Sequence, residues 1–248
     1  IDLDLTPYRH IVLYIFSGLT LITVLISLFA PAVGNFEKDL VAKGLSQAQT
    51  KMKLTRTNAE NSQATSFGVN KGVVILGDSV ALRSKDQIES SIDNVAIDAV
   101  VSRNLSTIND LLKDYADSNA LAKDVVIAGG VNEIDDYKGV INKMIKNLPK
   151  GHHIIFVTPY NGSKSGSKAV SLVQLRKYEL EMAKKYDFVT VADWYQVAKE
   201  NISIWNGTDG VHFGSDSDSI NRGAKLYTNT IKEAIAKANQ KPVKGGKK

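Results

Sequence analysis

Short apolar runs alternate with longer amphipathic stretches between residues 71 and 240. Five runs are mostly apolar on consecutive positions, as is typical of strands buried on both faces of a parallel sheet: Val73–Leu76, Val95–Ile97, Val125–Ala128, Ile154–Val157 and Phe188–Val191. The stretches between and after them have helical spacing and cover residues 80–92, 105–118, 136–147, 168–186 and 219–238. This alternation predicts the α/β class, a three-layer sandwich with a central parallel sheet.

A different pattern precedes this domain. Residues 11–30 run for twenty positions without a charge, and a helix of that length would be about 30 Å long, the thickness of a bilayer's hydrocarbon core. We expect residues 11–33 to form one transmembrane helix after a flank of residues 1–10. Two alternatives remain open: a buried core helix, and a secretory signal cleaved near Ala30-Pro31-Ala32.

A polar segment separates the apolar run from the domain. Residues 34–70 are rich in Ala, Ser, Thr, Asn, Gln and Lys, and such a composition buries too little apolar surface to fold alone. We expect a linker here. The Lys and Arg residues on the two sides of the apolar run are too evenly divided to orient it. The chain starts at Ile1 rather than Met, from which we expect a fragment or a processed product.

Composition limits the chemistry. The net charge is +5, but four of the lysines lie in residues 241–248, where we expect a disordered basic tail and no nucleic-acid-binding face. There are no cysteines, which excludes a disulfide scaffold, a thiolate zinc site and a Cys nucleophile. No Gly-x-Gly-x-x-Gly follows the first strand, and we expect neither a cofactor nor a metal.

Ligands of parallel α/β sheets bind beyond the carboxyl ends of the strands. Ser79 follows the first strand in Gly77-Asp78-Ser79 and opens a helix, where free backbone N–H groups can bind an oxyanion. An ordinary helix cap is the alternative interpretation. Ser102 follows the second strand, and Asn132 follows two glycines after the third. The side chain of Asn132 could donate to an oxyanion, or Asn132 could instead be a turn residue in the left-handed conformation.

His212 has the setting of a general base. It lies beyond the last strand, with Asp209 three residues before it. A serine nucleophile needs a base, and the base needs a group that fixes its tautomer. The Asp-x-x-His pair offers both from one loop, although a chance pairing on a surface loop remains open. The other histidines lie in the membrane flank or lead into a strand: His10, His152 and His153.

In this order, Gly77-Asp78-Ser79, the small residue Ser102, Gly130-x-Asn132 and Asp209-x-x-His212 resemble the SGNH (GDSL-type) hydrolase superfamily over residues 72–238. That superfamily usually has Gly where this chain has Ser102. In this respect the run Asp98–Arg103, which contains Ser102, resembles the C-terminal extracytoplasmic domain of Gram-positive peptidoglycan O-acetyltransferases. The resemblance implies a sheet with the flavodoxin-like strand order.

The resemblance also implies roles. Ser79 would be the nucleophile, His212 the general base and Asp209 the orienting acid, while the oxyanion hole would use the backbone N–H groups of Ser79 and Ser102 and the side chain of Asn132. Acetyl would pass through acetyl-serine to a glycan hydroxyl, C6-OH of N-acetylmuramic acid, with a glucosamine acceptor as the open alternative. Implied partners are peptidoglycan glycan strands and a multi-span acyltransferase domain that delivers acetyl, with this domain on the extracytoplasmic face of the cell membrane.

Two other functions remain open. An SGNH carbohydrate or acetyl esterase would use the same triad and let water deacylate Ser79, and a non-catalytic cell-wall module would only bind glycan. The tether and Ser102 favour the transferase, and a binder has no need of Asp209 and His212 together. Substrate-binding residues are not identified, although four aromatic residues could stack on sugars, if they are not core: Tyr160, Trp194, Tyr195 and Trp205.

Overall fold

The computed structural model describes residues 14, 16–23, 67–132, 135–163 and 166–246, with 166–170 described by their backbone alone. It divides the chain into two compact units, Ile1–Lys38 and Asp39–Lys248. The expected flank (1–10), most of the expected membrane helix (11–33) and most of the expected linker (34–70) lie outside the described residues.

In the first unit, Tyr14 and residues 16–23 are helical. The large apolar side chains there are at least 53% exposed. The hydroxyls of Thr20 and Thr23 each donate to the carbonyl four residues earlier, at 2.8 Å. Within the described part of the chain, no helix combines the length and the apolar content that a membrane crossing requires.

Five parallel strands form the sheet of the second unit, in the order β2-β1-β3-β4-β5. Each coincides with one expected apolar run: β1 (Val73–Gly77), β2 (Val95–Ala99), β3 (Asp124–Ala128), β4 (His153–Val157) and β5 (Val189–Ala192). The predicted α/β class and the flavodoxin-like order are confirmed. Because parallel strands share one carboxyl edge, the residues after β1, β2 and β3 meet there.

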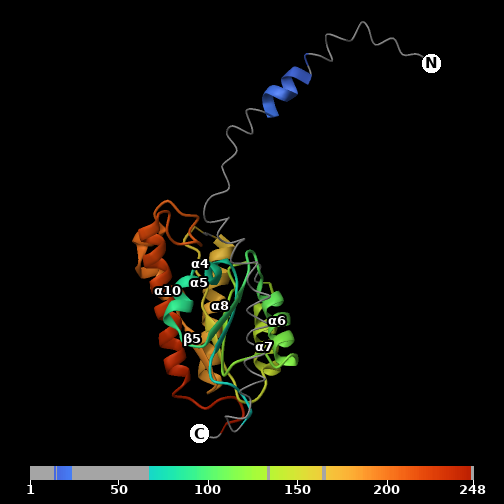
Figure 1. Ribbon diagram of the computed structural model, residues 1–248, viewed down its shortest axis with the longest axis vertical. Coiled ribbons are helices and arrows are strands. Elements are labelled where there is room, and N and C mark those ends of the chain that lie inside the picture. Colours follow the sequence, from blue (N-terminus) through green and yellow to red (C-terminus); the bar gives the residue numbers. More distant parts are fainter. Residues whose placement is uncertain (1–13, 15, 24–66, 133–134, 164–165, 247–248) are drawn as a thin grey trace, which may run out of the picture. The chain divides into compact units, whose positions relative to one another are not determined.

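Helices cover both faces of the sheet (Figure 1). Their bounds are α4 (Ser79–Arg83), α5 (Lys85–Ser91), α6 (Leu105–Asp117), α7 (Tyr137–Asn147), α8 (Gly166–Lys185), α9 (Trp194–Glu200) and α10 (Ser217–Ala238). Helices α6, α7 and α8 share one core with alternate strand residues such as Val74, Leu76 and Val125. Figure 1 places α10 on the opposite side of the sheet from α6 and α7.

The single helix expected over residues 80–92 is two helices, α4 and α5, separated by Ser84. The Ser84 N–H bonds to the carbonyls of Val80 and Ala81, and its hydroxyl donates to the Val80 carbonyl at 3.1 Å. Serine that bonds to the preceding turn competes with the helical pattern. The break makes Arg83 the last residue of α4.

A short helix and a 3-10 turn follow β5, where no element was expected: α9, then η2 (Ile202–Trp205). Both are too short for a periodic pattern, and aromatic packing holds them. Trp194 is 2% exposed and contacts the rings of Tyr227 and Phe213, with centroids 5.1 and 5.8 Å away. Trp194 is therefore a core residue and not a sugar-stacking one, whereas Tyr160, Tyr195 and Trp205 are half-buried.

The basic end of the chain differs from the expected disordered tail in its described part, residues 241–246. Lys244 Nζ donates to the carbonyls of Ile145, Lys146 and Leu148 at 2.8, 2.8 and 2.5 Å, and Lys241 Nζ donates to the Val189 carbonyl at 3.0 Å. A lysine ammonium satisfies the unpaired carbonyls that end a helix, here α7. Composition alone does not reveal such carbonyls within reach.

Candidate active site

Ser79 begins α4, directly after the sharp turn that follows β1. A Cβ on Gly77 would approach the Cβ of Ala81 to 2.5 Å, so the turn requires glycine there. Asp78 is the helix cap, because its carboxylate accepts the Val80 N–H at 2.9 Å. Ser79 is the first helical residue, is 5% exposed and has its hydroxyl free of any capping role. The cap interpretation thus applies to Asp78 and not to Ser79.

Three side chains from two distant segments form one hydrogen-bonded chain. His212 Nε2 lies 2.7 Å from Ser79 Oγ, and His212 Nδ1 lies 2.7 Å from Asp209 Oδ2. A carboxylate only accepts, so the proton of neutral His212 is assigned to Nδ1. Nε2 is then the acceptor for the Ser79 hydroxyl. This is the arrangement by which a base takes a proton from a serine nucleophile.

Asp209 is held as a carboxylate by its own loop. Its Oδ1 accepts the backbone N–H groups of Val211 and His212 at 2.9 and 2.8 Å. Burial raises the pKa of Asp209, but these hydrogen bonds and the one from the His212 ring outweigh it, so the pKa lies below its ordinary value. The acid therefore stays ionised at neutral pH and faces the imidazole as an anion.

The two further residues expected in the oxyanion hole lie at the same edge of the sheet. Ser102 adopts a left-handed conformation, with φ of 58°, which glycine would adopt without the steric cost of a Cβ. Asn132 Nδ2 donates to the Arg103 carbonyl at 3.3 Å and so reaches the Ser102 turn. Asn132 is absent from the described non-glycine residues of positive φ, and the left-handed turn alternative does not apply.

Arg103 ties the Ser102 turn to the end of β1. Its Nη1 donates to the carbonyls of Gly77 and Asp98 at 3.1 and 2.7 Å, and its Nη2 bonds to Asp98 Oδ1 at 2.9 Å. The Tyr115 hydroxyl donates to the other Asp98 oxygen at 2.9 Å. Sequence inspection did not single out Arg103 as a site residue, because the carbonyls it binds come from two strands.

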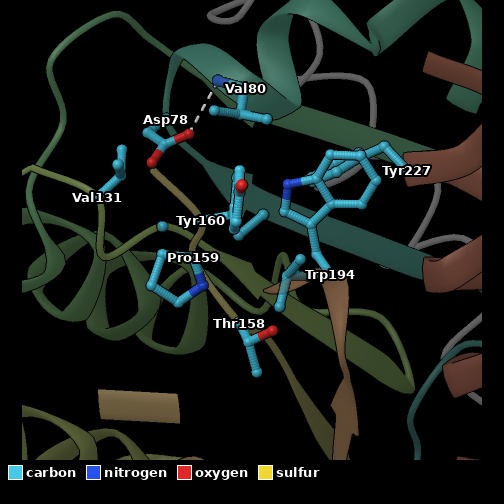
Figure 2. A pocket seen from close by; sticks show the side chains of 11 residues that line it. Asp78, Val80, Val131, Thr158, Pro159, Tyr160, Trp194 and Tyr227 are labelled. Atoms are coloured by element: carbon cyan, nitrogen blue, oxygen red, sulfur yellow. Dashed lines mark hydrogen bonds between the residues drawn. The ribbon is translucent and has the colours of Figure 1, made fainter. Parts of the chain in front are cut away.

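A small pocket lies beside the Ser79 turn, between the ends of β1, β3, β4 and β5 (Figure 2). Its volume is about 10 Å³, close to what a single water needs. Asp78 and Val80, the two neighbours of Ser79, form part of its wall, together with Val131 and Tyr160.

Asp78 is a second ionisable group of this wall. Burial raises its pKa to about 7, against the opposing effects of the Val80 and Ala81 N–H groups and of the Arg103 charge. In Figure 2 the Asp78 carboxyl accepts a hydrogen bond from the Val80 N–H and faces the pocket. The Asp78 carboxyl is consequently present in both protonated and ionised forms near neutral pH. The Gly-Asp-Ser sequence alone does not indicate this raised pKa.

The other described histidines lie elsewhere. His153 Nδ1 is 2.7 Å from Asp124 Oδ1, and the two residues begin β4 and β3 at the opposite edge of the sheet from Ser79. His152 bonds to the Ala122 carbonyl at 2.7 Å. His212 is thus the described histidine that meets Ser79. Among the described residues, no three His, Cys, Asp or Glu side chains form a group suited to a metal ion.

The doubly wound sheet and the Ser79–His212–Asp209 chain at its carboxyl edge define the class: the SGNH (GDSL-type) serine-dependent acyl-transfer enzymes. No protein-family model matches the chain. A structure of a lipolytic G-D-S-L family member from Veillonella parvula is 15% identical, covers 67% of this chain and 98% of its own, and superimposes with a TM-score of 0.54. That likeness concerns the fold.

A closer likeness comes from Streptococcus pneumoniae. The C-terminal catalytic domain of its peptidoglycan O-acetyltransferase A (OatA), solved with a methylsulfonyl adduct, is 44% identical, with a TM-score of 0.69 over 71% of this chain and 98% of that one. A Bacillus subtilis protein named as a candidate peptidoglycan O-acetyltransferase, YrhL, is 28% identical over 165 residues. The match spans 66% of this chain and 24% of YrhL. The chain belongs to the family of the OatA catalytic domain.

Proposed function

We propose that this chain is a peptidoglycan O-acetyltransferase that carries acetyl on Ser79. The observation that carries the proposal is the hydrogen-bonded chain from Asp209 through His212 to Ser79, at 2.7 Å for each contact between side chains. It occurs in a domain 44% identical to a catalytic domain of that name. A module that only binds glycan needs no such relay of a proton.

In the first half-reaction, the Ser79 hydroxyl proton passes to His212 Nε2 while Oγ attacks the carbonyl carbon of an acetyl donor. Asp209 stabilises the imidazolium that forms. The tetrahedral intermediate then collapses: the bond to the donor oxygen breaks, and the leaving group takes the proton from Nε2. The products are acetyl-Ser79 and the free donor alcohol.

The oxyanion hole is proposed to consist of the backbone N–H groups of Ser79 and Ser102 and the amide of Asn132. Support for Asn132 comes from its hydrogen count: an amide nitrogen has two N–H bonds, and one serves the Arg103 carbonyl, which fixes the direction of the other. Preorganised donors of this kind stabilise the developing negative charge.

In the second half-reaction a glycan hydroxyl, C6-OH of N-acetylmuramic acid, gives its proton to Nε2 and attacks acetyl-Ser79. The acetyl ester of the sugar forms and Ser79 regains its proton. The alternative is an esterase, in which water attacks instead. The side chains of Asp209 and His212 are 56% and 24% exposed, so the imidazole is accessible from outside to either acceptor.

The setting of the domain is part of the proposal. Residues 11–33 would cross the membrane once and residues 34–70 would link that helix to a domain on the extracytoplasmic face, where glycan strands are found. An associated multi-span acyltransferase domain would deliver the acetyl group. Support comes from the uncharged run of residues 11–30 and from the exposed apolar side chains of its described residues.

The experiment incubates the 248-residue chain with a chromogenic acetyl ester and with muropeptide or chitooligosaccharide acceptors, and reads the sugars by mass spectrometry. Ser79→Ala is the test variant, and Ser90→Ala, which alters an exposed serine of α5, is the matched control. Acetylated sugar made by wild type and by Ser90→Ala, but not by Ser79→Ala, is expected. Acetate release without acetylated sugar would favour the esterase, and no Ser79-dependent product at all would contradict acyl transfer.

A further inference from the structure

Arg83 connects the nucleophile helix to the loop of the base. It ends α4, one helical turn after Ser79, and is 7% exposed. Its Nε donates to the Phe213 carbonyl and its Nη2 to the Gly214 carbonyl, both at 2.7 Å. These two carbonyls belong to the residues directly after His212. One rigid guanidinium thus holds the backbone that carries the imidazole.

The backbone at Phe213 and Gly214 has little freedom of its own. Gly214 has φ of +79°, and a Cβ there would lie 2.3 Å from the Ile220 N atom. Its N–H donates to the Ile204 carbonyl at 2.7 Å, and the Phe213 ring is fully buried, with the Arg83 guanidinium 5.8 Å from its centroid. The loop backbone is therefore held in one conformation, and Arg83 links it to α4.

The catalytic contact is sensitive to that position. Ser79 and His212 are 133 residues apart in the chain and meet at 2.7 Å. Asp209 lies in the same loop as His212, so it orients the ring within the loop but does not connect the loop to Ser79. Catalytic groups must be held within about 0.5 Å of their productive geometry. A contact between α4 and the base loop therefore bears directly on the Ser79–His212 distance.

We propose that Arg83 is a positioning residue, which keeps His212 Nε2 within hydrogen-bonding distance of Ser79 Oγ by gripping the Phe213 and Gly214 carbonyls. The inference rests on the proposed function in so far as it takes Ser79 and His212 as the reacting pair. Arginine suits the task because its planar fork holds two acceptors at once, whereas lysine offers a single mobile ammonium.

The test compares Arg83→Lys and Arg83→Gln with wild type in the full chain. Met144→Ala is the control for stability alone, because Met144 is a fully buried residue of α7, a helix on the opposite side of the sheet from α10 (Figure 1). Three quantities are measured well below the unfolding temperature: kcat and KM for a chromogenic acetyl ester, the rate at which methanesulfonyl fluoride modifies Ser79, and the 15N resonance of His212 Nε2.

For Arg83→Gln we expect kcat and the sulfonylation rate to fall together by about 10²-fold, the cost of a misplacement of about 1 Å, with KM nearly constant. Arg83→Lys should retain more activity, because its ammonium can still reach one carbonyl. Met144→Ala should match wild type per folded molecule. Rates for Arg83→Gln equal to those of Met144→Ala would overturn the inference.

The Nε2 resonance separates this inference from the proposed function. It senses the hydrogen bond from Ser79 whether or not the chain turns over substrate. Arg83→Gln should move it in the same direction as Ser79→Ala does, whereas an unchanged resonance would overturn the role of Arg83 even in an active enzyme. A wild type that shows no Ser79-dependent turnover would contradict the proposed function and leave the resonance to decide the role of Arg83.

Discussion

Replacing Asp209 by Asn isolates the electrostatic part of the triad. Asp209 accepts three hydrogen bonds at 2.7 to 2.9 Å, two from backbone N–H groups on Oδ1 and one from His212 Nδ1 on Oδ2. The amide oxygen of Asn can keep the two backbone donors. Its NH₂ group then faces Nδ1 and donates to it, which places the imidazole proton on Nε2, opposite Ser79 Oγ. The serine hydroxyl is left without an acceptor.

We expect kcat/KM of Asp209→Asn to fall by about 10³ to 10⁴, which corresponds to about 4 to 5 kcal/mol at the transition state. The free energy of unfolding should change by about 1 kcal/mol or less, because the loop keeps its backbone hydrogen bonds. The assay is ester hydrolysis with parallel urea unfolding. Asp216→Asn makes the same change at the cap of α10 and should stay fully active. An Asp209→Asn variant within about tenfold of wild type would refute the tautomer argument.

Three further predictions concern the same edge of the sheet. Asn132→Ala should lower kcat by about 10² to 10³ in steady-state kinetics with folding intact; an unchanged kcat would limit the role of Asn132 to its hydrogen bond with the Arg103 carbonyl. Ser102→Gly should keep kcat within about threefold, because the proposed donor is a backbone N–H; a much larger loss would assign a role to the Ser102 hydroxyl. The pKa of Asp78, raised to about 7, means that the folded state holds a proton that the unfolded chain releases near pH 4. The folded state is therefore destabilised as pH rises toward 7. Between about pH 5 and pH 7 the free energy of unfolding, measured with urea, should fall by about 2 to 3 kcal/mol more for wild type than for Asp78→Asn. Equal decreases would contradict the raised pKa.

The sheet could be predicted because its strands are buried on both faces. Each short, mostly apolar run corresponds to one strand, and parallel pairing then brings Gly77 beside Ala99 and Ala128. The residues after these strands share an edge for the same reason. Proximity of Ser79, Ser102 and Asn132 therefore follows from topology, without knowledge of any side-chain contact.

The sequence pattern could not predict the side-chain contacts that are made to backbone carbonyls. Arg83 binds the carbonyls of Phe213 and Gly214, and Arg103 binds those of Gly77 and Asp98. A carbonyl is present at every position, so no residue type marks the partner. For Arg83 one signal was available in the sequence: a charged residue directly after the apolar Val80, Ala81 and Leu82.

The ends of elements were missed for related reasons. Ser84 interrupts a helix through a local hydrogen bond, which a periodic apolar pattern does not register. The segment at Lys244 was expected to be part of a disordered basic tail, whereas the Lys244 ammonium donates to carbonyls at the end of α7. In both cases a polar side chain donates a hydrogen bond to backbone carbonyls. The sequence identifies the donor side chain but not the carbonyls that it reaches.

The central claim, a covalent acetyl-Ser79 that is passed to a sugar, is tested most directly by trapping it. The full chain is mixed with an acetyl ester, quenched in acid and digested, and the peptide that contains Ser79 is weighed with and without a glycan acceptor. The account predicts one acetyl group on Ser79 that disappears as the acetylated sugar appears. Acetylated sugar formed without acetyl on Ser79, or formed equally by Ser79→Ala, would contradict it.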